Sequence, residues 1–174
     1  MSGSELIDIY DRDGRRTGKV MQRANAFLEE GQYMLYVLAV IQNLEGKFLI
    51  TRRALDKHWA AGNWEVTGGG VRAGEASGEA IVREVGEECG LDVSAQPLVP
   101  IFRYENVDLP RGDNYLVDIY HFHLDFSPAD VTLQRAEAID FRLVGWDDIE
   151  QLNQRGSFLH FERVRQALAA EGVL

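Results

Sequence analysis

One stretch of the chain, GEASGEAIVREVGEECGLDV at residues 74–93, constrains the fold more than any other part of the sequence. Its apolar side chains recur at helical spacing, which predicts an amphipathic helix over about residues 76–89 that packs on a sheet. Gly90 follows at the position where helices commonly end. Beside the apolar face, three glutamates fall within an arc of about 100° on an ideal helix; they are Glu84, Glu87 and Glu88. The fold must bury one face of this helix and gather three carboxylates beside it.

These glutamates are unfavourable for the helix, because its dipole disfavours negative charge in the last turns and the carboxylates repel one another. A solvated acidic face is the alternative, but such faces usually mix signs, and Arg83 is the only cation in the helix. A divalent cation would remove the repulsion, and oxygen ligands favour Mg²⁺, with Mn²⁺ as a substitute, over zinc. The glycine-rich turn TGGG at residues 67–70 lets backbone atoms approach a metal or a phosphate closely. We therefore predict a metal site here.

Length, charge and cysteine content set the class of protein. A chain of 174 residues with 45% apolar residues suits one globular domain over residues 1–174. A net charge of −10 argues against a nucleic-acid polymer as partner, although a bound metal can still attract small anions. The polar N-terminus is unlike a signal peptide, and the longest apolar run, MLYVLAVI, is too short for a membrane span. The one cysteine, Cys89, is expected to be a buried thiol, so the protein is predicted to be cytoplasmic and to bind no membrane.

The pattern along the chain predicts an α/β architecture, a mixed sheet covered by helices. Strands are expected at 6–20 (two, around a turn), 33–42, 47–53, 65–71, 96–106, 114–126 and 141–146, and helices at 76–89, 147–154 and 158–170. Gly78 and Gly86 lie inside the first helix at a cost of about 1 kcal/mol each relative to Ala, and no sequence pattern accounts for them.

Residues 69–91 match a long motif. Gly69, Glu75 and REVGEECGL at 83–91 have the spacing of the Nudix box, Gx5Ex7REUxEExGU, where U is a bulky aliphatic residue. The chain therefore resembles the Nudix hydrolase superfamily, and weaker similarity in LITRRALDKHWAAGNWEVTGGG and DIYDRDGRRTGK extends over most of its length. The resemblance implies the Nudix fold, an α/β/α sandwich with a mixed β-sheet and a loop–helix–loop box. It also implies hydrolysis of the diphosphate linkage in a nucleoside diphosphate joined to another group, X.

The resemblance assigns roles to the box residues. Glu84, Glu87, Glu88 and the backbone carbonyl of Gly68 would hold Mg²⁺, which would neutralise the diphosphate and lower the pKa of a bound water. Glu84 would be a metal ligand or the base that activates water, and Arg83 would orient it. Three further positions would support the loops: Gly69, Glu75 and Gly90.

Other candidates lie outside the box. Many family members take an extra base or ligand from the loop before the last strand, where Glu137 is the candidate and Asp140 the reserve; the alternative for Glu137 is an exposed loop acid. Arg52 and Arg53 end a strand near the predicted site and are candidates to contact phosphate. Two tryptophans, Trp59 and Trp64, are candidates to stack on a base or ring, with packing of the loop against the core as the alternative.

Two other functions stay open. The segment FLITRRALDKHWAAGNWEVTGGG resembles the isopentenyl-diphosphate isomerase branch of the superfamily. Those isomerases need a Cys and a His after the tryptophan, where this chain has WEVTGGGV, and Met34 stands where they place a ligand His. An isomerase-like Nudix hydrolase is therefore favoured over an isomerase. A domain that only binds a nucleotide is the third reading, and the intact glutamates argue against it. The sequence fixes neither the substrate nor the number of metal ions, and homodimers are common in the family.

Overall fold

The computed structural model of the chain describes residues 5–174. Its strands and helices follow the predicted order closely. In chain order they are β1 (Leu6–Tyr10), β2 (Arg16–Gln22), β3 (Met34–Gln42), β4 (Phe48–Arg53), β5 (Trp64–Glu65), β6 (Thr67–Gly70), α1 (Ser77–Cys89), β7 (Phe102–Asn106), β8 (Tyr115–His123), β9 (Ala138–Val144), α2 (Trp146–Gln154) and α3 (Phe161–Ala170).

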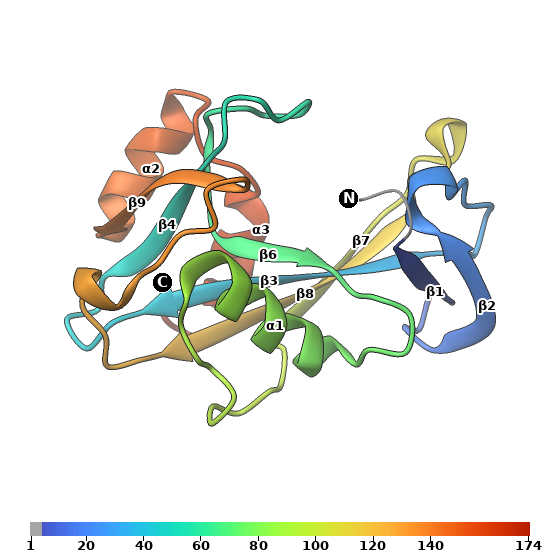
Figure 1. Cartoon of the computed structure of the whole chain (residues 1–174), viewed down its shortest axis with the longest axis horizontal. Helices are drawn as coiled ribbons and strands as arrows, with labels where there is room; N and C mark the ends of the chain where they lie inside the picture. The colour runs from blue at the N-terminus through green and yellow to red at the C-terminus, as the bar shows by residue number, and fades with distance from the viewer. Residues whose placement is uncertain (1–4) are drawn as a thin grey trace.

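The main sheet is mixed, as the sequence predicts. Its central strands β3 and β8 run parallel over nine residue pairs, from Met34 with Tyr115 to Gln42 with His123. The other strand pairings of this sheet are antiparallel: β7 flanks β8, β3 pairs with β6 and β4, and β4 also pairs with β9 and β5. Strands β1 and β2 form a separate hairpin at one end of the molecule (Figure 1). A bridge between Tyr10 and Tyr33 joins this hairpin to the segment that leads into β3.

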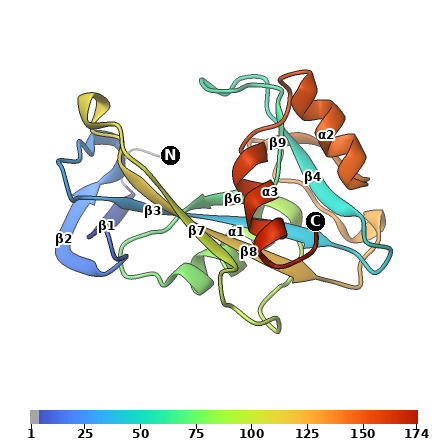
Figure 2. The same cartoon turned by 180° about the vertical axis from the view of Figure 1, so that it is seen from behind.

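Helices cover both faces of the sheet. In Figure 1 the helix α1 lies in front of the sheet, and Figure 2 shows α2 and α3 on the opposite side. The strand β3 supplies both layers, because side chains alternate across a strand. Val37 and Ile41 belong to the cluster under α1, whereas Leu38 and Val40 belong to the cluster under α2 and α3. This three-layer arrangement fixes which side of the sheet α1 occupies.

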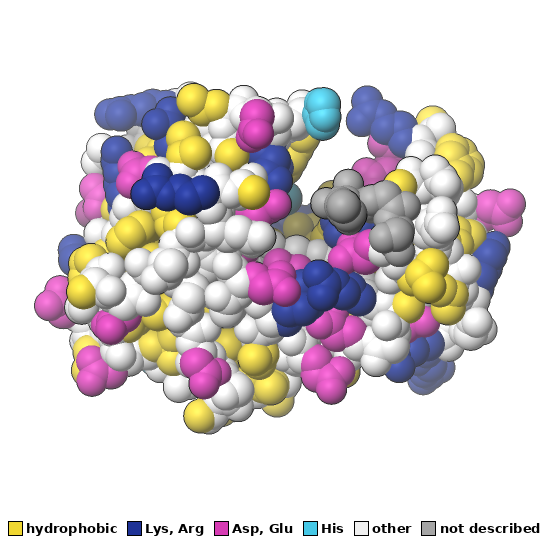
Figure 3. Space-filling view, in the orientation of Figure 1, with side chains coloured by type: hydrophobic (Ala, Val, Ile, Leu, Met, Phe, Trp, Pro, Cys, Tyr) yellow, Lys and Arg dark blue, Asp and Glu magenta, His cyan; other side chains and the backbone are white. Residues whose placement is uncertain are grey.

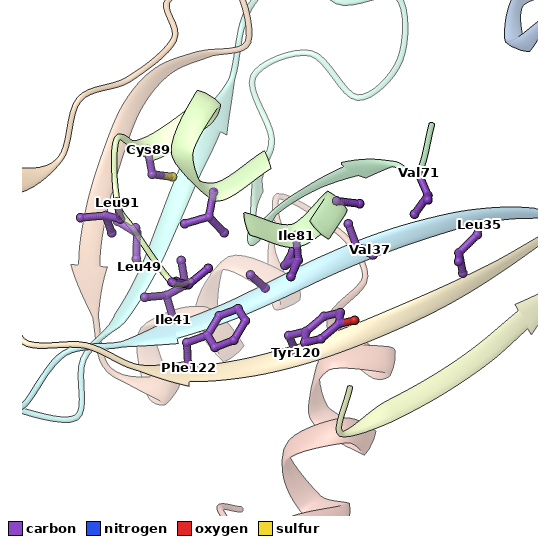
Figure 4. Close-up of a cluster of buried hydrophobic side chains, with 14 of the residues drawn as sticks. Leu35, Val37, Ile41, Leu49, Val71, Ile81, Cys89, Leu91, Tyr120 and Phe122 are labelled. Carbon is purple, nitrogen blue, oxygen red and sulfur yellow. The ribbon is translucent and has the colours of Figure 1, made fainter. Parts of the chain in front are cut away.

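The apolar side of α1 packs on the centre of the sheet. Ile81 is fully buried beside Val37 of β3 and Tyr120 of β8, and Cys89 is fully buried at the other end of the helix, near Leu91 (Figure 4). Full burial of one aliphatic side chain contributes about 1.5–3 kcal/mol, so this contact anchors the helix. Burial also raises the pKa of the Cys89 thiol to about 12, which agrees with the expected inert, buried cysteine.

Several element boundaries differ from the sequence-based prediction: β9, expected at 141–146, spans Ala138–Val144, and β8 ends at His123 and not at 126. Two further differences have a local cause. The strand expected from residue 96 begins only at Phe102, because Pro97 and Pro100 lack the N–H that a ladder needs. The C-terminal helix begins at Phe161 and not at 158, since His160 has a left-handed φ of 60°. Both differences shorten an expected element and leave the topology unchanged.

The two unexplained glycines of α1 differ from each other. A Cβ on Gly78 would lie 3.2 Å from Cβ of Leu98, so the segment after the helix packs tightly on this position. A Cβ on Gly86 would meet only the carbonyl oxygen of Leu91, at an ordinary 3.8 Å. Close packing thus accounts for Gly78, whereas nothing in the structure explains Gly86.

Candidate active site

The acidic side of α1 faces the glycine-rich strand β6. A Cβ on Gly69 would lie 2.4 Å from the carboxylate carbon of Glu84, so this carboxylate rests against the Gly69 backbone. Gly68 is equally constrained, because its Cβ would lie 2.2 Å from the carbonyl oxygen of Val37. Gly68 thus lets β6 lie close to β3, whereas Gly69 leaves room for the Glu84 carboxylate next to the β6 backbone.

Arg83 braces this arrangement with all three of its nitrogens. Nε and Nη2 donate to the two carboxylate oxygens of Glu75 at 2.7 and 2.9 Å, and Nη2 also donates to the carbonyl of Gly70 at 3.0 Å. Nη1 donates to Glu84 at 2.6 Å and to Glu87 at 3.4 Å. Such a planar donor set fixes the direction of each partner. Arg83 therefore holds the start of the box, its glycine turn and the Glu84 carboxylate in one unit.

The three helix carboxylates have different environments. Glu88 is the most buried, and it accepts a hydrogen bond from the hydroxyl of Thr67. Burial and the negative charges of nearby acids together raise the pKa of Glu88 to about 8, against the opposing effect of the hydrogen bond from Thr67. Burial also raises the pKa of Glu84, although Arg83 opposes the rise. The Glu87 side chain is 44% exposed. A carboxylate that is buried among other acids is costly unless a cation joins it.

Glu65 is a site residue that the sequence analysis missed. It is held by Nη1 of Arg53 at 3.0 Å, and burial raises its pKa. The charge of Glu65 contributes to the raised pKa of Glu88, so the two acids face the same region. Strand alternation offered the signal: Trp64 and Val66 point into the core under α3, which directs Glu65 and Thr67 to the α1 side.

Of the two candidate acids outside the box, Glu137 lies near the helix carboxylates and Asp140 lies on β9. Glu137 lies just before β9 and pairs with Nζ of Lys57 at 2.5 Å, with its side chain 42% exposed. Its charge also raises the pKa of Glu88, which puts Glu137 within electrostatic reach of α1. Asp140, the reserve candidate, is exposed on β9, where it pairs in register with Arg52. Glu137 therefore lies near the helix acids, and its ion pair with Lys57 connects it to the loop of residues 54–63.

The predicted substrate residues are held by the loop of residues 54–63. Arg52 donates through Nε to the carbonyl of Gly62 at 2.9 Å, and Arg53 donates to the carbonyl of Trp59 at 3.2 Å. The ring of Trp59 is largely exposed and lies under the Arg53 guanidinium. Trp64 is buried in the core under α3, with Arg142 stacked on its ring. Trp59 can meet a ligand from the solvent, whereas Trp64 occupies the position of a packing residue.

The donor set fits a hard divalent cation. Carboxylate oxygens from one helix face a glycine-rich backbone, and burial of Glu84 and Glu88 leaves negative charge that a cation would compensate. Within residues 5–174, no three acidic, histidine or cysteine side chains stand together as a ready-made cation site. Glu84 instead accepts a hydrogen bond from Arg83, Glu88 accepts one from Thr67, and Glu87 is partly exposed to solvent. A hollow opens above β6 and α1 on this face of the molecule (Figure 3).

A mixed sheet, a glycine turn and a braced acidic helix define an α/β enzyme whose site suits a cation and an anionic substrate. Residues 32–166 match the NUDIX domain family, and the chain belongs to this family of hydrolases. The predicted Nudix fold, α/β with a mixed sheet, is thereby confirmed, as is the assignment to pyrophosphohydrolase enzymes. Nudix hydrolases generally use divalent metals and act on small molecules. Among residues 5–174, no helix is long and apolar enough to cross a bilayer.

Several known proteins are similar to the chain. An uncharacterised Nudix hydrolase of Listeria monocytogenes is 29% identical over 158 residues, covering 90% of this chain and 89% of the relative. The nucleoside triphosphatase NudI of an Enterobacter species is 31% identical, over 67% of this chain and 83% of the relative. An isopentenyl-diphosphate Δ-isomerase of Escherichia coli is 38% identical, over 63% of this chain and 60% of the relative.

Solved structures share the fold. The MutT protein of Methanosarcina mazei superposes with a TM-score of 0.57 at 27% identity, over 68% of this chain and 81% of that one. The protein DR0079 of Deinococcus radiodurans gives a TM-score of 0.65 at 19% identity, over 86% of this chain and 90% of that one, and supports the fold alone.

Proposed function

We propose that the protein is a Mg²⁺-dependent hydrolase that cleaves the diphosphate linkage of a nucleoside diphosphate joined to another group, X. One observation carries the proposal: the buried carboxylates of Glu84 and Glu88 lie beside a glycine turn, in an arrangement held by Arg83. Such a site is unfavourable for a protein that binds no cation. It suits one that binds a metal together with a charged substrate.

The helix residues would hold the metal. Glu84, Glu87 and Glu88 supply carboxylate oxygens, and the backbone carbonyl of Gly68 is the fourth donor. When bound, Mg²⁺ would neutralise charge on the diphosphate and lower the pKa of a coordinated water. Mn²⁺ prefers similar oxygen ligands and is expected to substitute.

The side chains of the protein position the reaction and take up the proton. Glu84 is our proposed proton acceptor, because burial raises its pKa and Arg83 fixes its direction. Glu137 is the alternative base, since it lies near the helix acids but is engaged by Lys57. Arg83 acts as a positioning residue in either case. If Glu84 is the base, Glu84→Gln should lower kcat far more than Glu137→Gln does.

The substrate is expected to approach from the hollow beside the loop of residues 54–63. The exposed ring of Trp59 is available to stack on a base, and Arg52 and Arg53 lie at the end of β4 as candidates for phosphate contacts. Trp64 would act only indirectly, by supporting this loop. Nucleoside triphosphates are the first substrates to test, because a relative is a nucleoside triphosphatase.

The other two functions are less well supported. Similarity to an isomerase gives that reading a basis, but the only cysteine of the chain, Cys89, is buried and its pKa is raised to about 12. A thiol in that state is a poor acid or nucleophile. A domain that only binds a nucleotide would not need three carboxylates beside a glycine turn. We also propose that residues 1–174 act as one domain, since helices on both sides pack on one sheet. A cytoplasmic location is proposed because a single cysteine suits a reducing compartment.

A substrate screen tests the proposal. Nucleoside triphosphates, nucleotide sugars, dinucleotides and isopentenyl diphosphate would be incubated with Mg²⁺ or Mn²⁺ and analysed for phosphate products. We expect Glu88→Gln to lower kcat/KM for the best substrate by at least about a hundredfold, because it removes a charged ligand. Hydrolysis of none of these compounds, or equal rates for wild type and Glu88→Gln, would refute the hydrolase. Isomerisation without phosphate release would establish the isomerase, and light scattering would test for a homodimer.

A further inference from the structure

Two arginines from distant parts of the sequence converge on one carboxylate. Nη1 of Arg23 lies 2.9 Å from Oε2 of Glu5, and Nε of Arg72 lies 2.8 Å from Oε1 of the same side chain. Arg23 opens the short helical turn after β2, Arg72 belongs to the loop between β6 and α1, and Glu5 precedes β1. The Glu5 carboxylate therefore lies between the two guanidinium groups and forms an ion pair with each of them.

This position adjoins the candidate active site. A Cβ on Gly70 would lie 2.7 Å from Nη1 of Arg23, so the guanidinium rests against the Gly70 backbone. The carbonyl of the same glycine accepts a hydrogen bond from Arg83, and the preceding glycine supports Glu84. The positive charge of Arg72 also opposes the rise in the pKa of Glu84 that burial causes. The arginine pair therefore lies at the edge of the carboxylate site.

The two arginines form ion pairs with the same carboxylate, although the charge of Arg72 also acts on Glu75 and Glu84. Arg23 and Arg72 share one carboxylate, whereas Arg53 has Glu65 and Lys57 has Glu137 as individual partners. The arginines are also accessible: 35% of the Arg23 side chain and 47% of the Arg72 side chain are exposed. Part of each arginine side chain is therefore open to solvent.

We propose that Arg23 and Arg72 form a subsite for a phosphate group carried by X, and that Glu5 occupies this subsite when no substrate is bound. The inference rests on the proposed function, because it assigns the anion to the substrate of that site. A phosphate offers three oxygens and up to two negative charges, so it can accept hydrogen bonds from both guanidinium groups with a larger charge than Glu5 supplies. Glu5 is thus an internal competitor of the substrate.

The ionisation of Glu5 is consistent with this competition. Burial raises its pKa, but hydrogen bonds from Arg72 and Arg23 outweigh that effect and hold the pKa below its usual value. Glu5 is therefore charged near neutral pH. Glu5→Gln would remove the competing charge and preserve the shape of the side chain.

A binding experiment tests the subsite without catalysis. Inorganic triphosphate would be titrated calorimetrically into metal-free protein in the presence of EDTA. We expect Glu5→Gln to tighten binding about tenfold, equivalent to about 1.4 kcal/mol, and Arg23→Gln or Arg72→Gln to weaken it by a similar factor. Arg12→Gln is the matched control, because Arg12 is 76% exposed on the same hairpin and pairs with Glu105 instead. This control should bind like the wild type.

A kinetic experiment assigns the anion to X. With one nucleoside, kcat/KM would be compared for its triphosphate, where X is phosphate, and for its diphosphate sugar, where X is uncharged. We expect Arg23→Gln and Arg72→Gln to lower the triphosphate-to-sugar ratio about tenfold. Hydrolysis with an unchanged ratio would overturn the subsite and leave the hydrolase intact. Arginine-dependent binding without hydrolysis of any compound would refute the proposed function and support the anion site.

A purely structural role gives a different result. If Glu5 only fastens the hairpin to the loop before α1, Glu5→Gln would lower the melting temperature and leave the affinity for triphosphate unchanged. Equal weakening by Arg12→Gln and by the two site variants would indicate a general charge effect. Either outcome overturns the proposal.

Discussion

The two sides of α1 follow opposite physical rules within one helix of 13 residues. The apolar side, with Ile81, Val85 and Cys89, is fully excluded from solvent and packs on the sheet. The acidic side carries Glu84 and Glu88, whose pKa values are raised because burial disfavours their charge. Burial of the apolar side stabilises the position of the helix, and burial of the carboxylates on the other side lowers that stability. Functional groups can be placed unfavourably where a neighbouring surface of the same element is packed well.

The largest effect on stability is expected from Glu88. Its pKa is about 8 in the folded protein against an ordinary value of 4.5, so between these pH values the unfolded chain loses a proton that the folded chain retains. The contribution of Glu88 to the stability of the metal-free protein should be fully present below about pH 4.5, fall as the pH rises to about 8, and then level off. Urea unfolding of the wild type and Glu88→Gln in EDTA would measure this. If the free energy of unfolding depends on pH equally in both proteins, Glu88 is not the cause of that dependence.

A second substitution probes the apolar side. Ile81→Ala removes a fully buried side chain, and we expect it to lower the free energy of unfolding by about 3 kcal/mol. Glu87→Ala, on the acidic side, should change it by less than about 0.5 kcal/mol, since Glu87 is substantially exposed. Thermal or urea unfolding of the two variants would measure the contrast. Similar losses in both would mean that the two sides are not energetically distinct.

Two glycines of the box are expected to differ, one in its effect on activity and the other in a small effect on stability. A Cβ on Gly69 would displace the Glu84 carboxylate, so Gly69→Ala should lower kcat about tenfold to a hundredfold, as a misplacement of about 1 Å does. Gly86→Ala has room for its methyl group and should stabilise the protein by about 0.5–1 kcal/mol. Activity and unfolding assays on both variants would test this. A loss of stability in Gly86→Ala would point to a constraint that the structure does not contain.

The local features of the fold could be predicted from the sequence. The spacing of apolar residues located α1, and Gly90 marked its end with a φ of 70°. The strand β4 and the glycine turn were also anticipated, because each depends on a short run of residues. The match of the box to the Nudix motif then assigned the site around Glu84. Features set by neighbours in the sequence are those that a pattern can predict.

Contacts between distant segments could not be predicted in the same way. The ion pairs of Glu5 with Arg23 and Arg72 join three segments that only the folded hairpin brings together. The burial of Trp64 follows from α3, which lies far along the chain. The place of Glu65 could be predicted only in part. Strand alternation predicts that it faces the α1 side, but its ion pair with Arg53 depends on the register between β4 and β5.

The parallel pairing of β3 with β8 has a consequence for the order in which the molecule assembles. β4, β5, β6, α1 and β7 all lie between these two strands in the sequence, so the centre of the sheet closes a very long loop. Pairings of this kind form slowly, because the entropy of loop closure is lost before the contacts form. During synthesis, α1 has no complete surface to dock on until β8 has left the ribosome. The acidic helix can therefore complete its packing only after the chain has been synthesised through His123.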